Sequence, residues 1–85
     1  MVDDDQALVR ANGLSVRRRR HDLSYSPREL VDAIGEASLL ASGLRDTITP
    51  NLLQGVEERA EPIPYMTLRL IAGGLDCDPV DILAE

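Results

Sequence analysis

Residues 48–64, ITPNLLQGVEERAEPIP, contain the strongest helix signals of the chain. Thr49 is a good N-cap residue, and Pro50 follows at the first helical position, where the missing N–H of proline costs nothing. Apolar side chains then recur at helical spacing, at Leu52, Leu53 and Val56. The prolines at 62 and 64 cannot continue a helix. The stretch therefore predicts a helix from Pro50 to about Arg59, followed by a loop.

The same start signal occurs upstream in SPREL, residues 26–30. Ser26 is the N-cap, Pro27 follows it, and Glu29 lies three residues after the cap, which is the capping-box spacing. The pattern predicts a helix from Pro27 to Gly35. Residues 36–47, EASLLASGLRDT, predict a further short helix, with Ala37, Leu40, Ala41 and Leu44 at helical spacing and Gly43 as a weak point.

The two ends of the chain add shorter elements. A first helix either begins after Asp5 or, because Asn12-Gly13 favours a turn, begins near Leu14 or Ser15 and runs to about His21. Near the C-terminus, YMTLRLIAGGL predicts a helix that ends at Gly73-Gly74, and Asp78-Pro79 predicts a short terminal helix. Because no run alternates with period two, we expect an all-α fold, a compact bundle of five or six short helices.

Composition sets the class of protein. Of the 85 residues 44% are apolar, with no Phe or Trp, and this length suits one domain. We place that domain at residues 14–85, after an acidic and partly flexible segment at residues 1–13. A single cysteine, Cys77, fits a reducing compartment. The apolar runs are too short for a membrane span, and no secretion signal is present, so we expect a cytoplasmic protein without membrane partners.

The net charge of −6 disfavours a nucleic-acid partner at first sight, because phosphate neutralisation supplies most non-specific affinity. Seven of the acidic residues, however, lie in Asp3–Asp5 and in the last ten residues. Without them nine arginines face eight acidic residues, and five of those arginines lie between residues 10 and 20. A basic face is therefore compatible with the acidic total.

From residue 47 onward the chain resembles the Cro/repressor-like helix-turn-helix family, also called XRE-type. The resembling features are Thr49 as cap, the Val56-Glu57 pair, a loop with Pro62 or Pro64, and the segments TLRLIAGGL and DPVDIL. Upstream, SVRRRR resembles the arginine-bearing first helix and SPRELVDAIG the second helix of the family. The resemblance covers about residues 14–83. It implies a lambda-repressor-like domain that binds an operator in double-stranded DNA as a homodimer.

The chain departs from the family after Gly35, where about twelve extra residues precede the recognition helix. Either residues 36–47 are a helical insert within the helix-turn-helix, or that segment is itself the second helix. We favour the insert, because SPRELVDAIG is more similar to the family's second helix.

The resemblance implies a role for individual residues. Base edges would be contacted from the first turn of the recognition helix, by Asn51 and Gln54 with Leu52 and Gly55 nearby. Phosphates would be held by Ser26, Arg28 and Thr49, and by a basic patch at Arg17 and Arg19. Glu57 would form an inward ion pair with Arg18 or Arg20.

Other functions have less support in the sequence. His21 and Cys77 have no second ligand at metal-binding spacing, and no glycine-rich phosphate loop or nucleophile–base pattern is present. We therefore expect neither an enzyme nor a metal or other cofactor. The competing hypothesis is an acidic protein-binding module on the same fold, similar to an anti-repressor or antitoxin, that binds a basic protein partner and not DNA.

Overall fold

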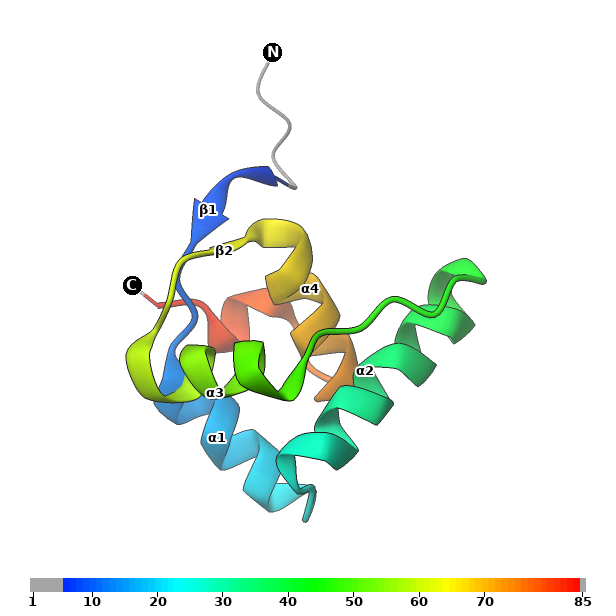
Figure 1. Cartoon of the computed structure of the whole chain (residues 1–85), viewed down its shortest axis with the longest axis horizontal. Helices are drawn as coiled ribbons and strands as arrows, with labels where there is room; N and C mark the ends of the chain where they lie inside the picture. Colours follow the sequence, from blue (N-terminus) through cyan, green and yellow to red (C-terminus); the bar gives the residue numbers. More distant parts are fainter. Residues whose placement is uncertain (1–5, 85) are drawn as a thin grey trace.

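A computed structural model describes residues 6–84, which form four α-helices, one short 3-10 helix and a two-stranded sheet (Figure 1). In chain order the elements are β1 (Leu8–Val9), α1 (Gly13–Asp22), α2 (Pro27–Ser42), α3 (Pro50–Arg59), β2 (Ile63–Pro64), α4 (Tyr65–Gly74) and the 3-10 helix η2 (Pro79–Ile82). The mostly helical class is as predicted, and the fold is compact, with a Cα radius of gyration of 11.8 Å. Within residues 6–84, none of the helices combines the length and the apolar content needed to cross a bilayer.

The helix count is lower than predicted because α2 continues through Gly35, where we expected it to end. Gly35 is buried beneath the Arg45 guanidinium, and a Cβ at this position would lie 2.5 Å from Arg45 Nη1. The glycine therefore serves a close approach and not a helix end. The helix stops instead at Gly43, whose φ of 80° is the left-handed conformation that glycine adopts most readily.

The predicted separate helix at residues 36–47 does not form. Its first half is the end of α2, and residues 43–49, hereafter the strap, have no helical structure and lead to α3. The strap lies along α2: the Thr47 hydroxyl donates to the Val31 carbonyl at 2.5 Å, and the Ser38 hydroxyl donates to the Leu44 carbonyl at 2.7 Å. Leu44 contacts Ser38, and Thr47, further along the strap, contacts the earlier residue Val31. The strap therefore runs antiparallel to α2, back toward its start (Figure 1).

The N-terminal segment is part of the domain from residue 7 onward, contrary to the boundary we expected at residue 13. β1 pairs antiparallel with β2, with Leu8 opposite Pro64 and Val9 opposite Ile63. The Asn12 side chain then accepts a hydrogen bond from the Ser15 N–H and caps α1, so the Asn-Gly pair begins a helix and is not a turn. Asp5, the alternative cap, and the rest of residues 1–5 lie outside the described residues.

The core is aliphatic and lies where α2 packs against α4, with α1, α3 and η2 closing it. Its fully buried large side chains are Val16, Leu30, Ile34, Leu53, Val56, Ile63, Leu68, Ile71 and Ile82. Gly74 allows the close contact of α4 with α2, because a Cβ there would lie 2.9 Å from the backbone nitrogen of Ile34. The C-cap of α4 is Leu75, and not the Gly73-Gly74 pair that we expected to cap it.

Candidate nucleic-acid interface

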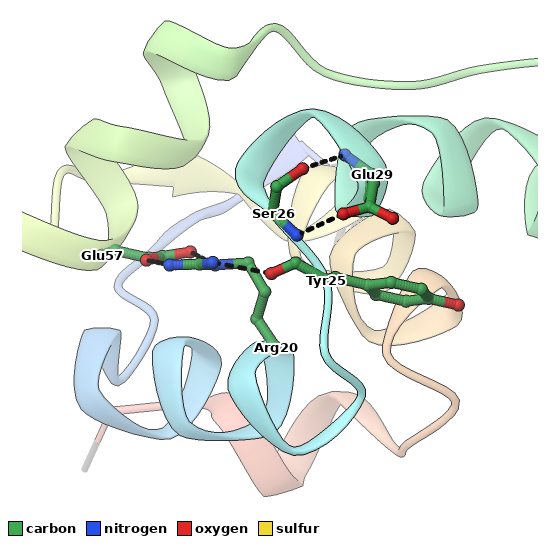
Figure 2. A network of polar contacts seen from close by, with 5 residues as sticks. All are labelled: Arg20, Tyr25, Ser26, Glu29 and Glu57. Carbon is green, nitrogen blue, oxygen red and sulfur yellow. Dashed lines mark hydrogen bonds and ion pairs between the residues drawn. The ribbon is translucent and has the colours of Figure 1, made fainter.

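A buried ion pair joins α1 to α3. Arg20 is 8% exposed, and its Nε and Nη2 donate to the two carboxylate oxygens of Glu57 at 2.8 and 2.9 Å (Figure 2). Its Nη1 donates to the Tyr25 carbonyl at 2.9 Å. The hydrogen bond with Glu57 raises the pKa of Arg20 above its ordinary value, although burial opposes this. Of the two partners proposed for Glu57, Arg20 forms the pair, and Arg18 is exposed.

The pair changes the electrostatics of α3. Bidentate hydrogen bonds of this kind satisfy both charges inside the protein. Glu57 therefore does not present its charge to a ligand, and the acidic charge at this surface comes from Glu58 of α3 and from Glu61, which follows the helix.

A groove of about 280 Å³ lies between α1, the start of α2 and α3. Its lining residues are Arg17, Arg20, Pro27, Pro50, Asn51, Leu53, Gln54, Glu57 and Glu58. Pro27 and Pro50 are the first residues of α2 and α3, so two helix N-termini meet at one groove. Helix N-termini carry partial positive charge and favour anions.

The hydroxyls of both N-cap residues are engaged within the protein. Ser26 Oγ accepts from the Glu29 N–H at 3.2 Å, and the Ser26 N–H donates to Glu29 Oε1 at 2.9 Å (Figure 2). Thr49 Oγ1 accepts from the Leu52 N–H at 3.1 Å. These caps use the third N–H of each helix, and proline occupies the first position. The N–H groups of Arg28 and Asn51 therefore remain without an intrahelical acceptor.

Two of the four residues that we expected to contact bases lie on the open surface. Asn51 and Gln54 are exposed and line the groove. Leu52 is half-buried and packs on the core, and Gly55 is buried. A Cβ on Gly55 would lie 2.5 Å from Glu61 Oε2, so this glycine makes room for the Glu61 side chain and not for DNA. The assignment of Gly55 to the DNA surface is therefore wrong.

The four consecutive arginines of α1 point to different surroundings. Arg17 lines the groove, Arg18 is exposed and Arg20 is buried. Arg19 lines a separate cavity with Asp76, Cys77, Asp78 and Asp81, so it does not belong to the surface that contains Asn51. Our placement of Arg19 beside Arg17 in one basic patch is thus incorrect, since neighbouring residues of a helix do not share a face.

The same cavity contains the single cysteine. Burial raises the pKa of the Cys77 thiol above its ordinary value, and the nearby Arg19 only partly opposes this. At neutral pH the thiol is consequently protonated, which disfavours reactions that need a thiolate.

Sequence reasoning did not assign Glu58 to the groove. Gln54 Nε2 donates to Glu58 Oε2 at 3.3 Å, so Glu58 orients the Gln54 amide. The spacing of four residues on a helix is a signal that identifies this pair in advance. Sequence reasoning also did not identify the position of Arg45, which lies over Gly35. Its Nη2 is 3.7 Å from Asp32 Oδ1 and 4.0 Å from Glu36 Oε1, and no local spacing indicates these contacts.

The surface thus combines two helix N-termini, two exposed amide side chains and the charges of Arg17 and Glu58, and the exposed Arg28 follows Pro27 in the first turn of α2. Comparisons with protein-family models, with curated proteins and with solved structures found no match to this chain. Across residues 6–84, no three His, Cys, Asp or Glu side chains are grouped so as to hold a metal ion.

Proposed function

We propose that this protein is a small sequence-specific DNA-binding regulator of the Cro/repressor type. In this proposal α2 and α3 form the helix-turn-helix, α3 is the recognition helix, and the strap replaces the short turn of that family. A homodimer would bind an operator with two-fold symmetry, as is usual for this motif. The observation that supports the proposal most strongly is the convergence of the N-termini of α2 and α3 on one groove bordered by Asn51 and Gln54.

Phosphate binding would use the start of each helix. The N–H groups of Arg28 and Asn51 have no intrahelical acceptor, and the dipoles of α2 and α3 add to their attraction for an anion. Full positive charges would come from Arg17, which lines the groove, and from the exposed Arg28, the second residue of α2. These contacts would position the domain on the duplex without selecting a sequence.

Sequence selection would come from the two amides. Asn and Gln pair with adenine by donating to N7 and accepting from the N6 amino group. One Nε2 hydrogen of Gln54 is directed to Glu58, and the second hydrogen and the carbonyl oxygen suffice for adenine. Glu58 would thereby hold the Gln54 amide ready for base contact, with each correct pair discriminating by roughly 1–3 kcal/mol.

The test is an NMR titration of labelled protein with a random-sequence duplex, first at low salt and then at higher salt. We expect the amide signals of Arg28, Asn51 and Gln54 to shift and the shifts to fade as salt rises. Arg17→Ala should weaken binding, whereas the matched control Arg18→Ala, outside the groove, should weaken it less. Unchanged spectra at low salt would refute DNA binding.

The second candidate is an acidic module that binds a basic protein. It is favoured by the net charge of −6 and by the Glu58 carboxylate in the groove. The same titration separates the two functions when an arginine-rich peptide replaces the duplex. The acidic module should respond to the peptide at Glu58 and ignore the duplex.

A further inference from the structure

The C-terminal half of α2 has an apolar stripe that faces away from the core. Ala37, Leu40 and Ala41 share one face of α2, and Leu44 follows them at the start of the strap. Leu40 is 87% exposed and Leu44 is 65% exposed. The core is filled from a different face of α2, by Leu30 and Ile34. An apolar stripe on the outer side of a helix is typical of a surface that contacts a partner.

Leu44 lines a hollow, and so does Ala41, the neighbour of Leu40 in the chain. An open groove of about 390 Å³ runs between α2, the strap and α4. Small residues of both helices line it, namely Ala37, Ala41 and Gly73, together with Leu44, Met66 and Leu70. Figure 1 shows that the end of α2 and the strap project from the rest of the fold. The projecting leucines and the groove therefore belong to one continuous surface.

We propose that this surface is the homodimer interface, with Leu40 and Leu44 of each copy packed into the groove of the other. A two-fold interface uses the same patch on both copies, so the patch must be complementary to itself. Projecting leucines beside a groove lined by small residues meet that requirement. The charges do so as well, because the groove contains one acidic residue, Asp46, and one basic residue, Arg69. A partner surface that complements this groove should carry one acidic and one basic residue, and a second copy of the chain does so.

The length of α2 is compatible with a dimer that binds two half-sites of DNA. This comparison rests on the proposed DNA-binding function. At 1.5 Å per residue the 16 residues of α2 span about 24 Å. The interface lies at the C-terminal end of α2, and the DNA surface lies at its N-terminal end. Two copies joined at this end place their α2 N-termini at most about 48 Å apart, and closer where the helices cross. Half-sites one helical turn apart require roughly 34–36 Å, which lies within this range.

Ten residues of α2, the strap and α4 line the groove. Stable interfaces bury about 1,200–2,000 Å² in total and use about 20–30 residues a side, so the dimer should be reversible. We therefore expect a monomer–dimer equilibrium that depends on protein concentration.

Sedimentation velocity of the full chain, in the absence of DNA, tests the interface. The wild-type protein should change from monomer to dimer as its concentration rises from about 1 µM to about 1 mM, which spans micromolar dissociation constants. Leu40→Glu should weaken dimerisation at least tenfold, because it places two like charges in the interface. Val80→Glu is the matched control, since Val80 is 71% exposed on η2 and outside the groove. Circular dichroism checks that both variants remain folded.

Two results would overturn the proposed interface. One is a wild-type chain that remains monomeric over the whole range, and the other is a dimer that Val80→Glu disrupts and Leu40→Glu does not. Isotope-filtered NMR of a mixed-label sample gives a second measurement. Intermolecular contacts between the Leu40 or Leu44 methyl groups and Met66 support the interface, and intermolecular contacts of Val80 in their place contradict it.

The experiments distinguish a failure of the proposed interface from a failure of the proposed DNA binding. Loss of dimerisation in Leu40→Glu, combined with unchanged spectra when duplex is added, would retain the interface and refute DNA binding. Amide shifts at Asn51 on addition of duplex, combined with unchanged dimerisation in Leu40→Glu, would retain DNA binding and refute the interface.

Discussion

Arg20 and Glu57 form the polar contact on which the packing of α1 against α3 depends most. Both side chains are buried, and two hydrogen bonds of 2.8 and 2.9 Å join them. Loss of one partner would leave the other charge buried without compensation. That cost exceeds the net stabilisation that the intact pair provides.

Glu57→Ala should therefore lower the free energy of unfolding by about 3–5 kcal/mol. Arg18→Ala is the control, because Arg18 is exposed on α1, the helix that contains Arg20, and it should change stability by less than about 0.5 kcal/mol. Urea denaturation of both variants measures the difference. Equal effects of the two substitutions would mean that the pair is not buried in solution.

Two glycines with crowded surroundings should differ in how strongly substitution by alanine destabilises the fold. A Cβ on Gly74 meets the backbone of Ile34 at 2.9 Å, and neither helix yields easily, so Gly74→Ala should destabilise the fold by about 1–3 kcal/mol. A Cβ on Gly55 meets only the end of the flexible Glu61 side chain. Gly55→Ala gains about 1 kcal/mol of helix propensity and loses an exposed Arg59–Glu61 pair of similar or smaller value.

Gly55→Ala should consequently have close to wild-type stability, and thermal unfolding of both variants checks the contrast. A strongly destabilised Gly55→Ala would show that Glu61 cannot move aside. The Glu61 side chain would then be held more rigidly than a partly exposed side chain with one ion pair.

At the scale of elements, the first turn of α2 depends on pH through its capping box. The Ser26 N–H, and secondly its hydroxyl group, hold the pKa of Glu29 below the ordinary value of 4.5. Since the folded pKa is depressed, the capping contribution is complete above pH 4.5 and is lost as pH falls through the folded pKa. An NMR pH titration should find that Glu29 titrates below 4.5 in the wild type and at a higher pH in Ser26→Ala. A wild-type pKa of 4.5 or above would contradict the capping box.

The strap is a second element whose conformation depends on a few contacts. Ser38 is buried, and its hydroxyl donates to the Leu44 carbonyl and accepts from the Asp46 N–H at 3.2 Å. Ser38→Ala removes both contacts and should cost about 1–3 kcal/mol. Hydrogen exchange of the Asp46 amide should accelerate.

Ser42→Ala is the matched control for the strap, because the Ser42 hydroxyl accepts from Leu44 and not from Asp46. The Asp46 amide should exchange at its wild-type rate in that variant. Equal acceleration in both variants would indicate that the strap is held by other contacts. In that case the burial of Ile48 in the core, and not the Ser38 hydrogen bonds, would position the start of α3.

At the scale of the whole molecule, the acidic total limits how strongly the proposed regulator binds DNA. Among residues 6–84, we assign phosphate binding to the side chains of Arg17, which lines the groove, and Arg28, which is exposed at the start of α2. Each neutralised phosphate contributes about −0.9 to the slope of log K against log salt concentration. A dimer with two such arginines per copy should therefore show a slope of about −4.

Fluorescence anisotropy with a labelled duplex at several salt concentrations measures this slope. Arg28→Ala should reduce its magnitude by about 2 for a dimer, since one arginine is lost from each copy. A slope near zero would indicate that the arginines do not meet phosphates. A slope far steeper than −4 would indicate a basic surface other than the groove.

The candidate site was predictable where a residue acts within its own helix turn. The cap-and-proline signals at Ser26-Pro27 and Thr49-Pro50 correctly located the starts of α2 and α3. Asn51 and Gln54 were expected to be exposed because they lie opposite the apolar face of α3. Arg19 and Gly55 were misplaced because their positions depend on the C-terminal acidic residues and on Glu61, which no local pattern connects to them.

The sequence by itself determined the helical class, the N-terminal starts of α2, α3 and α4, and the burial of Leu53 and Val56 on α3, because capping and apolar periodicity act over one or two turns. Only the tertiary structure decided that α2 passes Gly35, that Leu40 and Leu44 are exposed, and that residues 7–12 join the fold. Each of these outcomes depends on contacts between residues distant in the chain, such as Arg45 over Gly35 and Val9 opposite Ile63. A helix end or an apolar stripe has the same local pattern whether it meets the core, a partner or another segment, and only packing distinguishes these cases.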